Sequence, residues 1–420
     1  MIYTIKQKFF DSLIIFMSIM SAGGLLFVFN RNVSYMCFLL LLFITIFFLG
    51  KKINRSQLNS NVITFLSISF LFTINYIFAI NDQGLNKYLY YIMVVLTSIL
   101  VLFHFINNRS YVILVDRIYW ILRLIVLHAF LSFLAFFFIK NSITIITSTH
   151  HECETFLNIF FYTTERGLMD LFGFEFCRNQ GLFWEPGVLQ GFLNMFFFLE
   201  AFIFRKSRSL LLLTAIVILT TYSTTGIALL LVQSAVFLFS EFKKNKWLIP
   251  FIFLLSIPIY IIFSINVEDK IQGEKQASFQ KRYFDLVQPF FIALEYPLTG
   301  IGLDIDQFQR MRQEFYFSSS SLKSLQEQVG IESNVTSTSK GSSNSIMFLF
   351  ATMGIPTSFL MLYMFFNQQI IKEKRWLWML IMVVSVMSEP LLLRPFFFLF
   401  IVSGFTYTFY KITSFKHQII

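Results

Sequence analysis

Arginines stand just outside several apolar segments of the sequence, at Arg166, Arg178, Arg282, Arg310, Arg312 and Arg394. An arginine is always charged, and its planar guanidinium presents a fork of N–H donors that matches phosphate and carboxylate oxygens. Several such forks at one surface could grip a pyrophosphate. Each arginine could instead pair with a lipid phosphate or with an acid in a loop, such as Glu175, Asp285 or Glu314. The sequence leaves both alternatives open.

Two glutamates precede prolines at the expected outer ends of helices: Glu185 in "WEPG" and Glu389 in "SEPL". A carboxylate at such a place is costly unless it is paired, hydrated or functional. Glu185 could act as a general base or position a sugar hydroxyl. Alternatively, it caps the helix start and complements the helix dipole, with Pro186 in the first turn.

Two further groups of residues have the types that bind metals. Asp304 and Asp306 resemble the acidic pair that holds a divalent metal in nucleotide-sugar transferases, although such acids more often cap a helix. The string "HHECE" at residues 150–154 places ligand types side by side, but adjacent residues rarely reach one tetrahedral ion together. The serine-nucleophile, P-loop and dinucleotide patterns are absent. We therefore expect neither a metal nor a cofactor.

Composition shows which elements must position these residues. The chain has 420 residues, of which 56% are hydrophobic and 13% charged. Its apolar runs are close to the roughly 20 residues that a helix needs to cross the hydrocarbon core of a membrane. The net charge of +10 comes from short basic clusters between these runs, as the positive-inside rule requires. The sequence thus predicts an all-α polytopic membrane protein without a nucleic-acid partner.

The apolar runs and basic clusters predict about twelve transmembrane helices in a single membrane domain, residues 1–420, with both termini in the cytoplasm. The expected spans are 9–29, 33–50, 61–80, 88–106, 112–139, 181–204, two within 209–240, then 247–265, 345–366, 376–390 and 395–411. The polar stretch "TTYSTTG" at residues 220–226 divides the pair within 209–240. It predicts either two short helices that meet at a break, or a helical hairpin with a polar turn.

Two external loops are long, at 140–180 and 266–344, and long loops in compact proteins are often functional. The second is expected to hold an amphipathic helix near 277–296, which lies on the membrane surface or on other helices. Its Ser-rich part, 318–345, predicts a flap or linker. Cys153 and Cys177 fall in the first loop, where two thiols outside the cytoplasm could form a disulfide.

Four stretches occur in the order seen in the bacterial O-antigen polymerase and O-antigen ligase superfamily: "RNQGLFWEPGVLQGFL", "TTYSTTGIALLL", "KRYFDLVQPFFIALEYPLTGIGLDIDQF" and "SSNSIMFLFATMGIPTSFL". The chain resembles a Wzy-type polysaccharide polymerase over about residues 175 to 365. The positions that match the family pattern are Arg178, Gly181, Pro186, Gly226, Arg282, Pro297, Gly300, Gly302, Asn344 and Gly354.

The resemblance implies a metal-independent glycosyltransferase of the GT-C type that uses glycans linked to undecaprenyl diphosphate. It also implies that Arg178 and Arg282 hold the pyrophosphate. Ligases of the superfamily usually carry a histidine immediately before the asparagine of the last polar step. Here Ser343 precedes Asn344, which favours a polymerase over a ligase.

We therefore expect a growing glycan to be transferred from undecaprenyl diphosphate to a lipid-linked repeat unit at the outer face of the bacterial inner membrane. The expected catalytic residues are Arg178, Arg282 and Glu185, and the expected substrate-binding residues are Arg310, Arg312, Asn344, Glu389 and Arg394. Membrane lipids and a chain-length regulator are candidate partners. The alternatives are an O-antigen ligase and a lipid-linked oligosaccharide flippase, although a flippase would be expected to place charges within its spans.

Overall fold

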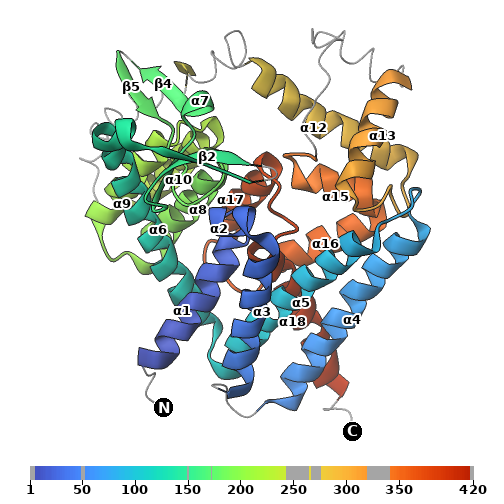
Figure 1. Ribbon diagram of the computed structural model, residues 1–420. Coiled ribbons are helices and arrows are strands. Elements are labelled where there is room, and N and C mark those ends of the chain that lie inside the picture. The colour runs from blue at the N-terminus through green and yellow to red at the C-terminus, as the bar shows by residue number, and fades with distance from the viewer. Residues whose placement is uncertain are drawn as a thin grey trace. The chain divides into compact units, whose positions relative to one another are not determined.

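The computed structural model describes residues 5–48, 53–148, 151–171, 173–242, 264–265, 276–318 and 341–416. These residues are mostly helical (Figure 1). They form two compact units, each assembled from separate stretches of the chain. The first unit draws on Met1–Phe38, Val115–Asp269 and Ile371–Ser385, and the second on Leu39–Leu114, Lys270–Ile370 and Val386–Ile420.

Helices long and apolar enough to cross a membrane occur throughout the described residues, as expected of a polytopic membrane protein. Six reach this length: α3 (Arg31–Phe48), α4 (Arg55–Phe78), α5 (Leu85–Asn108), α6 (Tyr111–Ile139), α8 (Pro186–Phe198) with its continuation η2 (Leu199–Phe204), and α18 (Pro395–Lys416). Four shorter apolar helices are α9 (Arg208–Thr220), α10 (Thr224–Phe242), α16 (Ile355–Phe366) and α17 (Arg375–Ser388). The expected span at 247–265 lies outside the described residues except at its last two positions.

The first apolar run is broken, although one continuous helix was expected at 9–29. Helix α1 (Ile5–Met20) ends before Gly23, whose φ is +107°, and α2 (Leu25–Phe29) follows it. A later segment of the first unit satisfies the backbone at this break. The N–H of Leu25 donates to Leu182 O at 2.9 Å, and the N–H of Trp184 donates to Gly23 O at 3.1 Å. The break therefore holds the segment that leads into α8.

The stretch "TTYSTTG" interrupts helical structure, as its composition predicts. Helix α9 ends at Thr220 and α10 begins at Thr224, and between them Tyr222 has a positive φ of 47°. Both helices contact α8. With 13 residues, α9 is about 20 Å long, which is less than the roughly 30 Å of hydrocarbon in a membrane. Two helices thus meet at a short polar turn.

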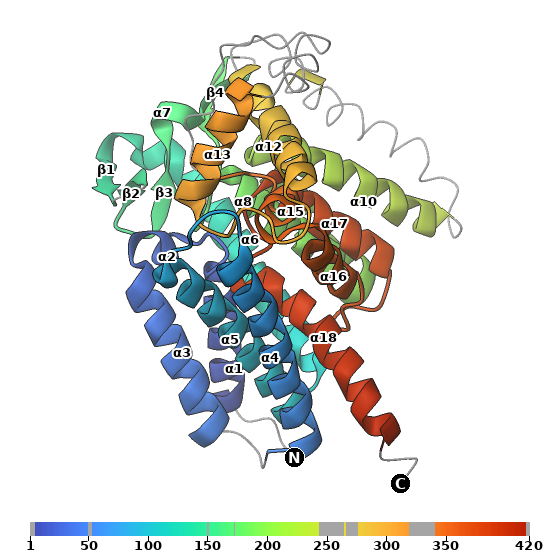
Figure 2. The same cartoon turned by 90° about the vertical axis from the view of Figure 1, so that its right-hand side faces the viewer.

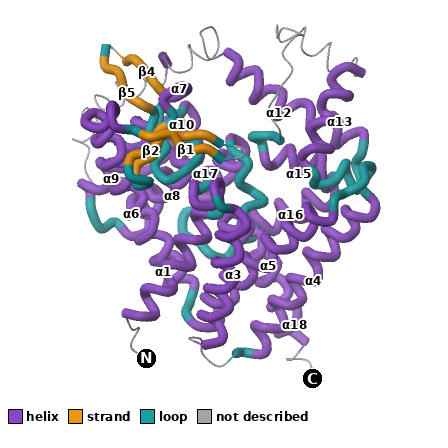
Figure 3. The backbone as a smooth tube through the Cα atoms, in the orientation of Figure 1, coloured by secondary structure: helices purple, strands orange, loops and turns teal. Residues whose placement is uncertain are grey.

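The segment expected to be the first external loop contains two small antiparallel sheets, which the sequence analysis did not anticipate (orange in Figure 3). One has the strand order β1-β2-β3 and the other is a β4-β5 hairpin. The elements are η1 (Lys140–Ser142), β1 (Thr144–Thr147), β2 (Glu152–Phe156), β3 (Phe160–Tyr162), α7 (Thr164–Gly167), β4 (Leu168–Leu171) and β5 (Phe174–Cys177). Their β-branched and aromatic residues favour strands.

The disulfide that Cys153 and Cys177 could form is absent, and both cysteines are free and buried. They pack in different apolar clusters: Cys153 contacts the cluster of Leu25 and Phe161, and Cys177 that of Phe136 and Tyr162. The two thiols do not meet although they lie in one loop, because Cys153 is in β2, Cys177 is in β5, and these strands belong to different sheets.

We predict that neither thiol reacts with iodoacetamide in the native protein at pH 7.5. Burial raises the pKa of Cys153 to about 12 and that of Cys177 to about 11, so the reactive thiolate is scarce at this pH. Mass spectrometry of proteolytic peptides would measure the modification at each of the two residues, with protein denatured in dodecyl sulfate as the control in which both react. A mass two hydrogens lower before reduction would instead reveal the disulfide.

In the second unit, α18 packs against both α4 and α5, and these helices lie side by side in Figures 1 and 2. Helix α12 (Gln276–Glu295) packs on α15 (Ser345–Met353) and contacts α13 (Ile305–Ser318). The helix expected at 277–296 is therefore present. Its buried face includes Asp285 and Gln288, whereas the apolar stripe Leu286, Phe290 and Leu294 is exposed.

The stretch "PLTGIG" at residues 297–302 joins α12 to α13 and lies against the junction of α15 and α16. The N–H of Ile355 donates to Pro297 O at 2.7 Å, and the N–H of Ile301 donates to Ala351 O at 3.0 Å. Gly354 forms the junction with a φ of +77°, and a Cβ there would lie 2.2 Å from Leu298 O. Only glycine allows this approach, so these motif residues fix how α12 and α13 sit on α15.

Candidate active site

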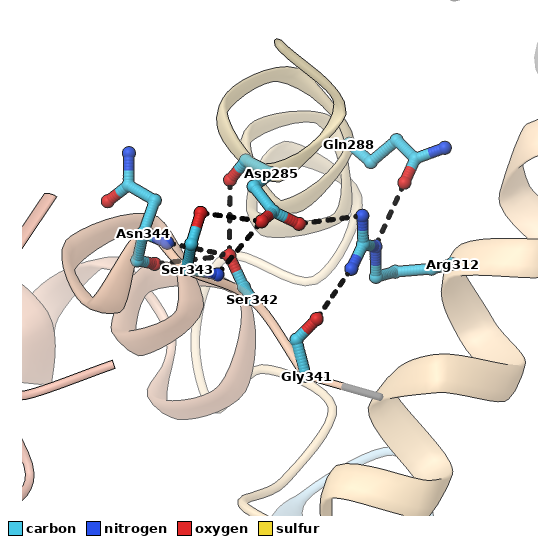
Figure 4. Close-up of polar contacts among 7 residues, drawn as sticks. All are labelled: Asp285, Gln288, Arg312, Gly341, Ser342, Ser343 and Asn344. Carbon is cyan, nitrogen blue, oxygen red and sulfur yellow. Dashed lines mark hydrogen bonds and ion pairs between the residues drawn. The ribbon is translucent and has the colours of Figure 1, made fainter. Parts of the chain in front are cut away.

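A buried ion pair joins α12 to α13. Nη2 of Arg312 lies 2.9 Å from Oδ1 of Asp285, and the two side chains are 2% and 0% exposed (Figure 4). Nε of Arg312 donates to Oε1 of Gln288 at 2.9 Å, and Nη1 donates to the carbonyl of Gly341 at 2.8 Å. Burial lowers the pKa of Arg312 and Asp285 opposes that shift. A guanidinium nevertheless stays charged at neutral pH.

These contacts give Arg312, which was expected to bind substrate, partners within the protein. All three guanidinium nitrogens have partners within the protein, and the side chain is buried. The alternative interpretation, an arginine paired with Asp285, is correct at this position. Arg312 instead holds the carboxylate of Asp285 in place.

Ser343 connects this carboxylate to the surface. Its hydroxyl donates to Oδ2 of Asp285 at 2.7 Å, and its backbone N–H donates to the same oxygen at 2.9 Å (Figure 4). Ser343 is half-buried, whereas Asp285 is fully buried. We call Asp285, Arg312 and Ser343 the Asp285 cluster. A hydroxyl held by a buried carboxylate can pass a proton inward.

Asn344, which was expected to bind substrate, orients the start of α15. It is buried, and its Oδ1 accepts a hydrogen bond from the N–H of Met347 at 3.1 Å, as an N-cap does. Next to it, the Ser345 hydroxyl donates to the carbonyl of Glu389 at 2.7 Å. The polar step "SSNS" therefore caps α15 while it presents Ser343.

The other site residues that were expected in the second unit lie on different elements. Arg282 is half-buried on α12, one helical turn before Asp285, which places both on the same side of that helix. Arg310 is exposed on α13. Glu389 is buried in the α17–α18 connection, and Arg394, just before α18, donates to the Tyr90 hydroxyl at 2.9 Å.

Arg178 and Glu185 belong to the first unit. Nε of Arg178 donates to Thr221 O at 3.1 Å, so the arginine is tied to the α9–α10 turn. The neighbouring Asn179 also contacts this turn, because its Nδ2 donates to Thr220 Oγ1 at 3.1 Å. The same Nδ2 donates to Ala129 O, in α6, at 2.8 Å. The stretch "RNQG" thus docks onto the polar turn of "TTYSTTG".

Glu185 occupies the N-cap position of α8 with Pro186 in the first turn, as the capping interpretation predicts. Its side chain makes no capping hydrogen bond within the described residues, and the residue is exposed. The carboxylate thus adds charge near the positive end of the helix dipole while it remains accessible.

The two groups of residues with metal-binding side chains make other contacts in the structure. Oδ1 of Asp304 accepts from the N–H of Asp306 at 2.9 Å, at the start of α13, so this acid caps a helix. Within the part of the chain that the structure describes, no three His, Cys, Asp or Glu side chains are grouped to hold an ion. Residues 152–154 of the string "HHECE" lie in β2, where Cys153 is buried.

Comparison with known families supports the sequence motifs. Residues 209–364 match the family model described as O-antigen ligase. The chain is similar to that family over this stretch, which we call the O-antigen ligase family domain. This confirms its resemblance to the O-antigen polymerase and ligase superfamily. A comparison with curated proteins finds no match of significance.

The O-antigen ligase family domain spans α9, α10, α12, α13, α15 and most of α16. It contains Arg282 and the whole Asp285 cluster, whereas Arg178 and Glu185 precede it. The sequence analysis treated Asp285 only as an acid that could pair with an arginine. Its position one helical turn after Arg282 was the available signal that the two residues share one side of α12.

Proposed function

We propose that this protein is a polysaccharide polymerase that transfers a growing glycan from undecaprenyl diphosphate to a lipid-linked repeat unit at the outer face of the bacterial inner membrane. The O-antigen ligase family domain supports the reaction class. The observation that carries the choice of polymerase is Ser343, which stands before Asn344 where ligases usually have histidine. The proposal includes twelve membrane spans of GT-C type and cytoplasmic termini.

In this reaction a hydroxyl of the repeat unit attacks the anomeric carbon of the growing glycan. A new glycosidic C–O bond forms, the C–O bond to the diphosphate breaks, and undecaprenyl diphosphate leaves with the bonding electrons. Arg178 and Arg282 stabilise the negative charge that develops on the leaving group, the kind of preorganised electrostatic effect that often dominates catalysis. Breaking the bond to diphosphate supplies the driving force.

The Asp285 cluster receives the proton that the attacking hydroxyl loses. The hydroxyl proton moves to Ser343 Oγ while the Ser343 proton moves to Oδ2 of Asp285, over the 2.7 Å hydrogen bond that already joins them. Arg312 keeps the buried carboxylate in position. Glu185, Arg310, Glu389 and Arg394 are proposed to contact the sugars or the diphosphate.

The decisive experiment gives the purified protein a lipid-linked repeat unit alone, without ATP or nucleotide sugar. Elongation to a ladder of products is expected on a gel. A second reaction also contains lipid A core, and transfer of a glycan to this acceptor, with no ladder in either reaction, would indicate the ligase that the name of the family domain suggests. Movement of the lipid across a vesicle membrane without elongation would indicate a flippase.

The proposed partners are undecaprenyl-diphosphate-linked oligosaccharides, membrane lipids and a chain-length regulator. A regulator would be recognised by its effect on product length, because the ladder formed by the enzyme alone would be broader than the ladder formed with the regulator present.

A further inference from the structure

A separate cavity lies at the end of α8, in the first unit. Its volume is about 240 Å³, and it is lined by residues of η2, of the turn into α9, of α9 and of α10. Glu200, Arg205, Ser207, Arg208, Leu211 and Phe237 contribute to its wall. The cavity contains none of the residues assigned above to glycan transfer.

Both oxygens of the carboxylate in this wall accept hydrogen bonds from within the protein. Glu200 is buried, its Oε2 accepts from the Tyr119 hydroxyl at 2.7 Å, and its Oε1 accepts from the N–H of Ser207. The carbonyl of Glu200 also accepts from the N–H of Arg205 at 2.9 Å. Both carboxylate oxygens thus serve to fold the turn, which places Arg205 in a left-handed conformation with φ of 51°.

The remaining charges of the wall are positive. Arg205 and Arg208 are exposed, and Ser207 is the N-cap of α9, so the positive end of that helix dipole faces the same turn. Two guanidiniums beside a helix N-terminus are donors suited to phosphate oxygens. The cavity therefore favours a phosphate-bearing ligand.

Apolar and aromatic groups next to the cavity indicate which kind of phosphate-bearing ligand it binds. Leu211 and Phe237 form an apolar part of the wall. Lys206 lies over the rings of Tyr119 and Phe204, with its Nζ at 4.6 and 4.7 Å from their centroids. Aromatic rings combined with basic side chains at the end of an apolar helix are typical of the membrane interface. A ligand with a phosphate head and hydrocarbon tails fits both parts of the wall.

We propose that this cavity binds the head group of an anionic phospholipid, with the phosphate held by Arg205 and Arg208 and the acyl chains along Leu211 and Phe237. The topology expected from the basic clusters places these arginines on the cytoplasmic side, where anionic lipid attracts them. The bound lipid would fix the turn between α8 and α9.

The test is native mass spectrometry of the purified protein titrated with phosphatidylglycerol or phosphatidylcholine. Wild type is expected to retain one phosphatidylglycerol more tightly than phosphatidylcholine. The double variant R205A/R208A is expected to bind phosphatidylglycerol roughly 25-fold more weakly, about fivefold for each charge removed. Both arginines are exposed, so the variant should keep the thermal stability of wild type in detergent.

The matched control is Arg55→Ala, which removes an exposed arginine at the first position of α4 in the second unit. It should bind phosphatidylglycerol as wild type does. Equal binding by the double variant and wild type, or an equal loss in the control, would overturn the site. Displacement of the lipid by inorganic phosphate would overturn the lipid assignment and identify free phosphate as the ligand.

Discussion

Alanine at Arg178 or Arg282 is expected to lower polymer formation about 30- to 1000-fold, which corresponds to a loss of about 2–4 kcal/mol of transition-state stabilisation. Each arginine is proposed to neutralise charge on the departing diphosphate. Lysine should restore little activity, because an ammonium keeps the charge but loses the planar fork of donors. Polymer length would be followed on gels at matched membrane levels of each variant.

The control for the arginine series is Arg55→Ala, which should form polymer normally because Arg55 is an exposed residue outside the proposed site. Near-normal polymer from both alanine variants would show that Arg178 and Arg282 only make structural contacts, such as the bond from Arg178 to Thr221. The diphosphate model would then be abandoned. The proton path through Ser343 is tested separately, by substitutions at Asp285 and Ser343.

Asp285→Ala is expected to destabilise the protein by about 3–5 kcal/mol, because it leaves the guanidinium of Arg312 buried without its counter-charge. The double variant D285L/R312M should recover most of that stability, since apolar residues of similar size often replace a buried ion pair at little cost. It should remain inactive because Ser343 has lost its proton acceptor. Thermal unfolding in detergent and the polymerisation assay would measure the two effects separately.

Ser343→Ala tests the proton path without removing the buried ion pair that stabilises the fold. It removes a half-buried hydroxyl but keeps the ion pair between Asp285 and Arg312, so the unfolding temperature should change little. Activity should fall about 100-fold or more, the range that proton transfer by a positioned group contributes. If Ser343→Ala polymerises at the wild-type rate, the relay is wrong and Asp285 has only a structural role.

The sequence by itself determined the class of the protein and several local features. Long apolar runs separated by basic clusters predict membrane helices, because hydrophobic length alone decides whether a helix can span. The break at "TTYSTTG", the helix near 277–296 and the Asp304 cap were also predictable. Each of these depends on residues that are neighbours in the chain, so the local pattern contains the necessary information.

Only the tertiary structure decided which of the polar residues work together. Asp285 contacts Arg312 and Ser343, which lie 27 and 58 residues further along the chain, through the packing of α12 on α13 and α15. Similarly, the break at Gly23 is held by residues near 183, and the two loop cysteines pack in separate clusters. The burial and the partners of a polar side chain arise from these long-range contacts. Residue type alone therefore does not distinguish an arginine that is free to bind substrate from one that a buried carboxylate already holds.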